Sequence, residues 1–206
     1  MDLTAAEIRV LGCLLEKQRT TPDTYPLTLN ALRAACNQAT NRDPVVQYDD
    51  ETIRNALHQL GKRRWTRLAS GHGSRAAKYR HLLEEELRLG REEQALLAAL
   101  MLRGSQTPGE LLQRTERLYH FGTAEELHAT LDRLIERDLV VRLSRRPGQR
   151  EERYAHLLGG EAPDEETEAA AAAPVSDDRL DRIERDLADL RAQVRELREM
   201  LTGSGQ

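Results

Sequence analysis

Six side chains that could contact nucleic acid lie within one short segment of the chain. Between residues 52 and 63, apolar residues recur at Ile53, Leu57 and Leu60, which is the spacing of the buried face of a helix. The remaining positions then face outward and carry Arg54, Asn55, His58, Gln59, Lys62 and Arg63. Amides can pair with adenine, and arginine or lysine with guanine or phosphate. The pattern predicts a DNA-contacting helix, although a basic face that meets only solvent has the same pattern.

Further cations follow this helix in a predicted β-hairpin. Residues 65–70 and 78–83 have the character of short strands, and a glycine-containing basic loop lies between them. The cationic side chains of the hairpin would extend the contact along a nucleic-acid backbone: Arg67, His72, Arg75 and Lys78.

Catalytic chemistry has little support in the sequence. The six histidines show no His-x₃-His spacing, and the two cysteines do not form a Cys-x₂-Cys pair, so the sequence predicts no metal site. A glycine-rich phosphate loop and a Gly-x-Ser-x-Gly elbow are also absent. We therefore expect a binding protein without catalytic residues or cofactor, not an enzyme.

The helix and hairpin recur later in the chain. Residues 126–134 carry Leu127, Leu131 and Leu134 at the same steps as the first copy. With one extra residue placed before the second hairpin, Arg67-Leu68 aligns with Arg142-Leu143. The copies close with Tyr-Arg-His-Leu-Leu at 79–83 and Tyr-Ala-His-Leu-Leu at 154–158. This similarity predicts a duplicated unit of three helices and two strands.

The predicted elements give each unit the order α-α-α-β-β. Helices are expected at about 4–17, 28–37 and 49–64, and again at 92–102, from 107 and from 123, with strands also at 139–144 and 153–158. Capping residues Thr4, Asp49, Thr107 and Thr123 support these starts. A helix followed by a strand, a basic loop and a strand is typical of a winged-helix domain. We predict winged-helix domains at 1–83 and 84–158, linked through residues 84–90.

The two predicted units differ in charge. Residues 1–83 contain 13 Lys or Arg and 8 Asp or Glu, whereas residues 84–158 contain 12 and 14. The outer positions of the second unit's third helix are mostly acidic: Glu125, Glu126, His128, Asp132, Arg133 and Glu136. Its hairpin is basic, with Arg142, Arg145, Arg146 and Arg150. Either this unit touches DNA through the hairpin alone or its helix contacts protein, and we favour protein contact because phosphates repel acidic residues.

Composition fits small helical domains in a reducing compartment. Charged residues make up 32% and aromatic residues 3% of the chain, so leucine, alanine, valine and isoleucine must build the core. Cys13 and Cys36 occupy apolar-patterned helix positions, and we expect two buried thiols and no disulfide. Because the sequence shows no signal peptide and no membrane-spanning run, we expect a soluble, cytoplasmic protein.

The C-terminal part changes character twice. Residues 159–176 are acidic and alanine-rich, which predicts a flexible linker. Residues 177–202 then follow a heptad pattern, which predicts a coiled-coil helix that pairs two chains. The alternative is a helix that folds back onto its own domains. The seam consists of Leu180, Ile183, Leu187, Leu190, Val194, Leu197 and Leu201.

Several stretches resemble the YceH-type family of uncharacterised bacterial proteins. They are residues 12–18, 20–22, 25–27, 35–38, 41–42, 44–45, 102–111 and 140–157. The resemblance implies two tandem winged helices without an established activity. Ala39 and Ser74-Arg75 depart from the family pattern. Loop motifs of this kind suggest a recognition surface made of Gln18, Thr21, Tyr25, Asn37, Gln38, Asn41 and Arg42. The alternative is that these residues brace the turn between the first two helices and the contact between the two domains.

These observations favour a mainly helical protein with small β wings. The expected architecture is two tandem winged-helix (helix-turn-helix) domains followed by a coiled-coil helix. The expected function is DNA binding of the transcription-regulator type, with double-stranded DNA as partner and self-association through the coiled coil. The alternative is a protein–protein adaptor of the kind found in chromosome-organising complexes.

Overall fold

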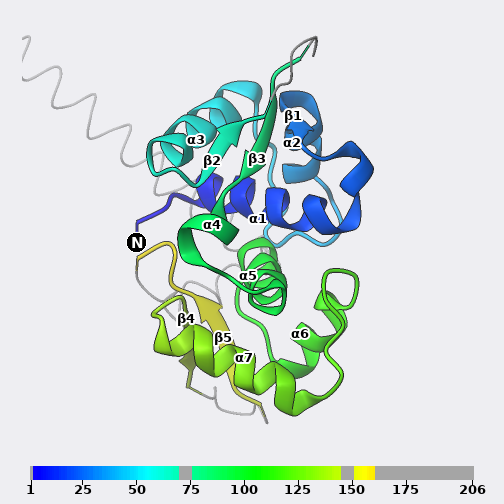
Figure 1. Ribbon diagram of the computed structural model, residues 1–206, viewed down its shortest axis with the longest axis vertical. Helices are drawn as coiled ribbons and strands as arrows, with labels where there is room; N and C mark the ends of the chain where they lie inside the picture. Colours follow the sequence, from blue (N-terminus) through cyan, green and yellow to red (C-terminus); the bar gives the residue numbers. More distant parts are fainter. Residues whose placement is uncertain (1, 70–75, 145–150, 161–206) are drawn as a thin grey trace, which may run out of the picture. The chain divides into compact units, whose positions relative to one another are not determined.

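The structure is a computed structural model that describes residues 2–69, 76–144 and 151–160. All of these belong to the first of two compact units, Met1–Ala162. The described part is mainly helical and contains two small antiparallel sheets (Figure 1). Its first half contains α1 (Ala5–Thr20), the 3₁₀ helix η1 (Pro22–Thr24), β1 (Leu27–Thr28), α2 (Leu29–Cys36), α3 (Asp50–Lys62), β2 (Thr66–Leu68) and β3 (Lys78–His81).

After one additional short helix, the second half repeats the order of three helices and a final pair of strands. It contains α4 (Leu83–Leu87), α5 (Arg91–Arg103), α6 (Pro108–Thr115), α7 (Ala124–Glu136), β4 (Val140–Leu143) and β5 (Arg153–His156). The segment expected to link the units, residues 84–90, contains most of α4. Leu83 anchors this short helix, since its side chain is fully buried.

The predicted helix starts at Thr4, Asp49, Thr107 and Thr123 are confirmed by their hydrogen bonds. The hydroxyl of Thr4 accepts from the backbone N–H of Glu7, and the Glu7 carboxylate accepts from the N–H of Thr4. Each of the other three side chains accepts a backbone N–H from the residue three positions later. These bonds satisfy donors that a helix leaves free in its first turn.

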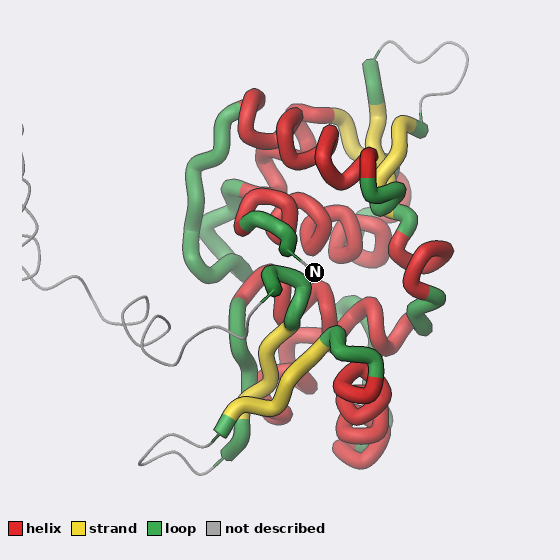
Figure 2. The backbone as a smooth tube through the Cα atoms, turned by 90° about the vertical axis from the view of Figure 1, so that its left-hand side faces the viewer, coloured by secondary structure: helices red, strands yellow, loops and turns green. Residues whose placement is uncertain are grey.

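The sheets of the two halves have matching strand pairs. In the first half β3 lies between β1 and β2, and Leu27 pairs with Tyr79. In the second half β4 pairs with β5, and an isolated bridge joins Gln106 to Tyr154. Leu27 and Gln106 lie one residue before the caps Thr28 and Thr107, so the bridge occupies the position of β1. Figure 2 shows the two strand groups as separate yellow segments.

Backbone pairing corrects the predicted alignment of the hairpins. Leu68 pairs with Tyr79, and Arg142 pairs with Tyr154, so Leu68 corresponds to Arg142 rather than to Leu143. The turns between the third helix and the strand have equal lengths, because Trp65 N–H donates to Leu60 O and Leu139 N–H donates to Leu134 O. The extra residue of the second copy therefore lies between the two strands of its hairpin.

The halves meet where α1 crosses α5 (Figure 1). Gly12 lies at this crossing, and a Cβ atom built on it would lie 3.0 Å from Cβ of Met101. Glycine therefore allows the two helices to approach closely. Backbone bonds from Leu3 N–H to Leu158 O at 3.0 Å and from Asp43 N–H to Leu102 O at 2.9 Å also join the halves.

Buried apolar residues from both halves form one core. The expected buried thiols are confirmed, since Cys13 and Cys36 are both fully buried and neither forms a disulfide. No helix among the described residues is long and apolar enough to cross a bilayer. The predicted linker at 159–176, apart from its first two residues, and the predicted coiled coil at 177–202 lie outside the described residues.

Candidate nucleic-acid interface

Helix α3 presents its predicted outer residues to solvent. Ile53, Leu57 and Leu60 are buried as expected, and they fix which face of the helix turns inward. The six predicted contact residues Arg54, Asn55, His58, Gln59, Lys62 and Arg63 are all exposed. The Arg54 side chain is 62% exposed and lies 3.9 Å from Asp50, a separation at which a surface ion pair contributes little. These outer side chains are therefore free to meet a partner.

A groove of about 490 Å³ lies between α3 and the β2–β3 hairpin. One strip of α3, spaced by four residues, forms one wall with Arg54, His58 and Lys62. The opposite wall contains Arg67 and Leu68 of β2 and Tyr79 of β3. Among the described residues, no aspartate or glutamate lines this groove. Its charge is therefore positive, which suits a phosphate backbone.

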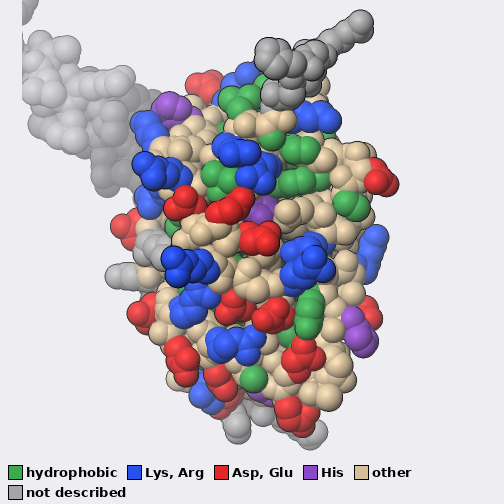
Figure 3. Space-filling model, viewed as in Figure 1, with side chains coloured by type: hydrophobic (Ala, Val, Ile, Leu, Met, Phe, Trp, Pro, Cys, Tyr) green, Lys and Arg blue, Asp and Glu red, His purple; other side chains and the backbone are tan. Residues whose placement is uncertain are grey.

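The adjacent strip of α3 consists of Asn55, Gln59 and Arg63. Arg63 donates through Nη2 to the backbone oxygen of Asp2 at 3.5 Å, which is at the limit of a hydrogen bond. In Figure 3, Lys and Arg side chains gather over the α3, β2 and β3 region, while Asp and Glu are frequent over α7. The predicted hairpin cations are only partly described, since Lys78 is half-buried and His72 and Arg75 lie outside the described residues.

Sequence reasoning did not include Leu68 and Tyr79 in the interface. Leu68 is 60% exposed, one of two large apolar side chains of the described residues that face solvent to this extent. The sequence gives little signal for Leu68, because an apolar residue that follows an arginine in a short strand is expected on the buried face. These two side chains add apolar surface to the lining of the basic groove.

The family-motif residue Arg42 lies in the interior of the molecule. Its side chain is fully buried, and its guanidinium donates to both carboxylate oxygens of Glu16 at 3.0 and 2.6 Å. It also donates to Ala35 O at 3.0 Å and to Gln38 Oε1 at 2.7 Å. The Arg42 guanidinium lowers the pKa of Glu16 against the opposing effect of burial. This ion pair fastens the loop after α2 to α1.

Asn37 and Tyr48 clamp the long loop between α2 and α3. The Asn37 amide donates to Tyr48 O, and Tyr48 N–H donates to Asn37 Oδ1, both at 2.8 Å. Asn41 has a left-handed backbone with φ 59°, and its carbonyl accepts from Arg42 at 2.8 Å. The Asn37 amide and the Arg42 guanidinium therefore form hydrogen bonds with other residues of the same chain.

Gln18, Tyr25 and His81 form a second internal cluster. Gln18 Oε1 lies 2.6 Å from His81 Nε2, so that nitrogen donates, and Tyr25 Oη accepts from His81 N–H at 2.9 Å. Burial raises the pKa of Tyr25 to about 12 and lowers the pKa of His81 to about 4. Thr21 is exposed, with its hydroxyl bonded to Lys17 O at 3.3 Å. All seven motif residues thus form hydrogen bonds within the chain.

Helix α7 has the same buried face as α3 but opposite outer charges. Leu127, Leu131 and Leu134 are fully buried, as Ile53 and Leu60 are. At the positions of Arg54, His58 and Lys62, α7 carries His128, Asp132 and Glu136.

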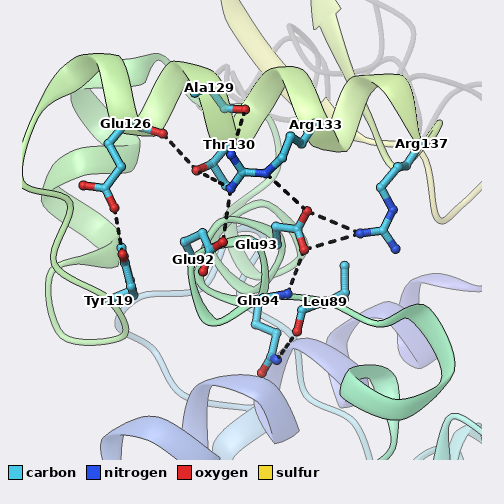
Figure 4. A network of polar contacts seen from close by, with 11 residues as sticks. Leu89, Glu92, Glu93, Gln94, Tyr119, Glu126, Ala129, Thr130, Arg133 and Arg137 are labelled. Carbon is cyan, nitrogen blue, oxygen red and sulfur yellow. Dashed lines mark hydrogen bonds and ion pairs between the residues drawn. The ribbon is translucent and has the colours of Figure 1, made fainter.

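Arg133 of α7 and Arg137, which caps the C-terminus of this helix, pair with carboxylates of α5 (Figure 4). Arg133 lies 3.1 Å from Glu92, and Arg137 lies 3.3 Å from the buried Glu93. Tyr119 donates to Glu126 at 2.7 Å. This network fixes α7 against the rest of its half and leaves an acidic outer strip. Of the predicted second-hairpin cations, Arg142 is exposed and pairs with Glu152 at 3.3 Å, whereas Arg145, Arg146 and Arg150 lie outside the described residues.

Within the described residues, no group of three or more His, Cys, Asp or Glu has the arrangement of a metal site. The repeated histidines, His81 and His156, are the last residues of β3 and β5 and take part in strand pairing. Both have a buried Nδ1 atom without a hydrogen-bond partner in the described structure, and burial lowers the pKa of each to about 4.

Comparison with known proteins places the chain among bacterial homologues. A family model described as "Protein of unknown function, DUF480" matches residues 3–149. The chain belongs to this family. It is 44% identical over 203 residues to the UPF0502 protein YceH of Escherichia fergusonii, with 94% of each chain covered. It is 43% identical to a UPF0502 protein of Pectobacterium carotovorum, covering 94% of this chain and 96% of that protein. The resemblance to YceH-type proteins is thereby confirmed.

Proposed function

We propose that this chain is a DNA-binding protein of the winged-helix, transcription-regulator type. In this proposal α3 is the recognition helix and the β2–β3 hairpin is the wing. The observation that carries the proposal is the groove between them, which is lined by Arg54, His58, Lys62 and Arg67 and, within the described residues, by no carboxylate. Cations that face a phosphate backbone supply most of the affinity, whereas amides such as Asn55 and Gln59 contact base edges.

The second half is a second winged helix with a different role in this proposal. Its order of helices and strands matches the first half, and its hairpin pairs in the equivalent register. The acidic outer strip of α7 would repel phosphates, so we assign α7 to a protein contact. Residues 177–202 would pair two chains as a coiled coil, and a two-fold dimer would contact two half-sites of DNA.

The first test measures binding of the full-length protein to mixed genomic fragments at low salt by fluorescence anisotropy. Binding should weaken steeply as salt increases, because released counterions drive association. Lys62→Ala and Arg67→Ala should each reduce the slope of log affinity against log salt by about one. Arg91→Ala, an exposed arginine at the start of α5, is the matched control and should leave the slope unchanged.

Failure of the wild-type protein to bind any fragment at low salt would refute the proposal. The same conclusion would follow if Arg91→Ala changed the slope as much as Lys62→Ala does, because the effect would then reflect net charge rather than the groove. Selection of fragments by the chain with and without residues 177–206 would show whether pairing is needed for specific sites.

A second candidate function is that of a protein–protein adaptor. The acidic strip of α7 and the formal net charge of −4 favour it. A partner recovered in stoichiometric amount from a lysate treated with nuclease, and lost on Asp132→Ala/Glu136→Ala, would support the adaptor. Partners that disappear on nuclease treatment would instead support DNA binding.

A further inference from the structure

A second pocket, of about 440 Å³, lies between the end of α1, the loop that holds Asn41, and helices α5 and α6. Its lining contains three arginines, Arg103, Arg114 and Arg117. Ala99 and Leu102, both buried residues of α5, form an apolar part of the wall together with Leu118. The volume is within the range of pockets for small molecules.

The positive charge of this pocket is only partly compensated. Arg114 lies 3.2 Å from Glu110, but Glu110 also faces Arg153 at 3.6 Å. Glu16 is the acidic residue of the lining within the described part of the chain, and Arg42 at 2.6 Å already neutralises it.

The other two arginines have weaker partners. Arg103 donates to Asn41 Oδ1 at 3.5 Å, and Arg117 is exposed without an ion-pair partner among the described residues. Burial lowers the pKa of Arg103, and the positive charge of Arg114 lowers it further, whereas Asp43 and Glu110 partly oppose this shift. Cations that repel one another across a concave surface gain from an added anion.

We infer that this pocket binds a small anion whose phosphate or carboxylate group meets the arginines and whose apolar or aromatic body lies against Ala99, Leu102 and Leu118. Guanidinium groups form paired, charge-assisted hydrogen bonds with such anions. An apolar body would gain further affinity by leaving water for the wall of the pocket. No residue of this pocket lines the groove between α3 and the hairpin, so the inference does not rest on the proposed DNA binding.

The test uses the full-length protein and isothermal titration with two probes, phenyl phosphate and inorganic phosphate. Phenyl phosphate should bind at least about tenfold more tightly, because only it can use the apolar wall. Arg103→Gln/Arg117→Gln should weaken binding of phenyl phosphate at least about tenfold. Arg91→Gln, which removes an exposed charge from the other end of α5, should bind like the wild type.

A further variant separates the pocket from the groove. Arg54→Gln/Lys62→Gln should retain phenyl phosphate binding, and loss of binding there with retention in Arg103→Gln/Arg117→Gln would overturn the inference. Absence of binding to the wild type, or equal binding of the two probes, would also overturn it. Because Arg117 is exposed, Arg117→Glu should preserve the fold and weaken binding alone, with thermal unfolding as the check on folding.

Discussion

Helices α3 and α7 share their length, their capping and their buried pattern, but their outer residues carry opposite charges. Each spans 13 residues, begins at a side-chain cap and is followed by a residue with positive φ, Arg64 or Asp138, before the next strand. The buried positions are apolar in both helices except for Thr130 of α7, which takes the place of Ala56. The strip that faces the groove in α3 carries Arg54, His58 and Lys62, whereas the corresponding strip of α7 carries His128, Asp132 and Glu136.

This difference shows that burial restricts the residue type at core positions but not the charge at exposed positions. A core position loses several kcal/mol when its side chain no longer fits, so both copies keep leucine or isoleucine at the three positions of the apolar pattern. A solvent-exposed position costs little to change, so charge at these positions can diverge without loss of the fold. The duplicated scaffold therefore gives no evidence that both helices have one function.

The largest predicted effect concerns a buried ion pair of the first half. Counting from the N-caps Thr4 and Gly90, Glu16 of α1 corresponds to Leu102 of α5. Removing Arg42 leaves the Glu16 carboxylate without its main partner in a largely buried site. We expect Arg42→Met to lower the free energy of unfolding by about 3–5 kcal/mol, measured by urea denaturation.

The double variant Glu16→Leu/Arg42→Met makes this site resemble the second half. It should recover part of the loss, because no charge then remains buried. Recovery should be incomplete, since Ala35 O also loses the hydrogen bond from Arg42. If the single variant is as stable as the wild type, the ion pair does not hold the loop after α2.

The next effect compares the repeated histidines. His81 is 3% exposed, and His156 is half-buried, and burial is the first cause of the lowered pKa, about 4, of each. Around His81, Glu85 raises the pKa while Arg19 and Arg80 lower it. Between the ordinary pKa of 6.5 and the folded value of about 4, the unfolded state binds more protons. The contribution of the buried, neutral histidine to the free energy of unfolding is therefore complete above pH 6.5 and decreases as pH falls towards 4.

The free energy of unfolding should fall by at most about 3 kcal/mol for each histidine over this pH range. We expect the larger share from His81, because His156 is more exposed. Urea denaturation at several pH values would show a smaller loss in His81→Gln than in the wild type, and an intermediate loss in His156→Gln. An unchanged pH dependence in His81→Gln would refute this assignment.

Much of this architecture could be predicted from the sequence, for identifiable reasons. Capping residues such as Thr4 and Thr107 and the helical spacing of Ile53, Leu57 and Leu60 are local signals, and the structure confirms them. The outer residues of α3 followed from the same spacing. The alignment of the hairpins did not, because strand register depends on pairing between distant residues, such as Leu68 with Tyr79.

The loop motifs were harder to interpret from sequence alone. Arg42 and Asn37 are polar loop residues, and polar loop residues often contact a ligand. Here Arg42 is fully buried against Glu16, and this depends on a contact across 26 positions that no local pattern reveals. The pocket around Arg103 and Arg117 was missed for the same reason, since its lining comes from α1, α5, α6 and the loop after α2.

Exchanging the outer residues of α3 and α7 tests whether their charges determine DNA affinity. Arg54→His/His58→Asp/Lys62→Glu gives α3 the outer charges of α7. We expect DNA affinity at low salt to fall at least about a hundredfold, because two cations are lost and two anions face the phosphates. Arg91→Glu/Arg117→Glu makes the same change in net charge elsewhere and should have a much smaller effect. Equal loss in both variants would show that net charge alone sets affinity.

The smallest predicted effect comes from the reverse exchange. His128→Arg/Asp132→His/Glu136→Lys gives α7 the strip of α3, and a cation in the last turn of a helix also suits the helix dipole. We expect affinity for DNA to rise only about threefold to fivefold. The opposite wall still differs, since Val141 takes the place of Arg67 and the exposed Arg142, which takes the place of Leu68, is already paired with Glu152. Anisotropy titration in the background of the exchanged α3 would isolate the contribution of α7. Affinity equal to that of the wild type would mean that a basic strip on this scaffold is sufficient, and the hairpin would then lose its role in the proposed interface.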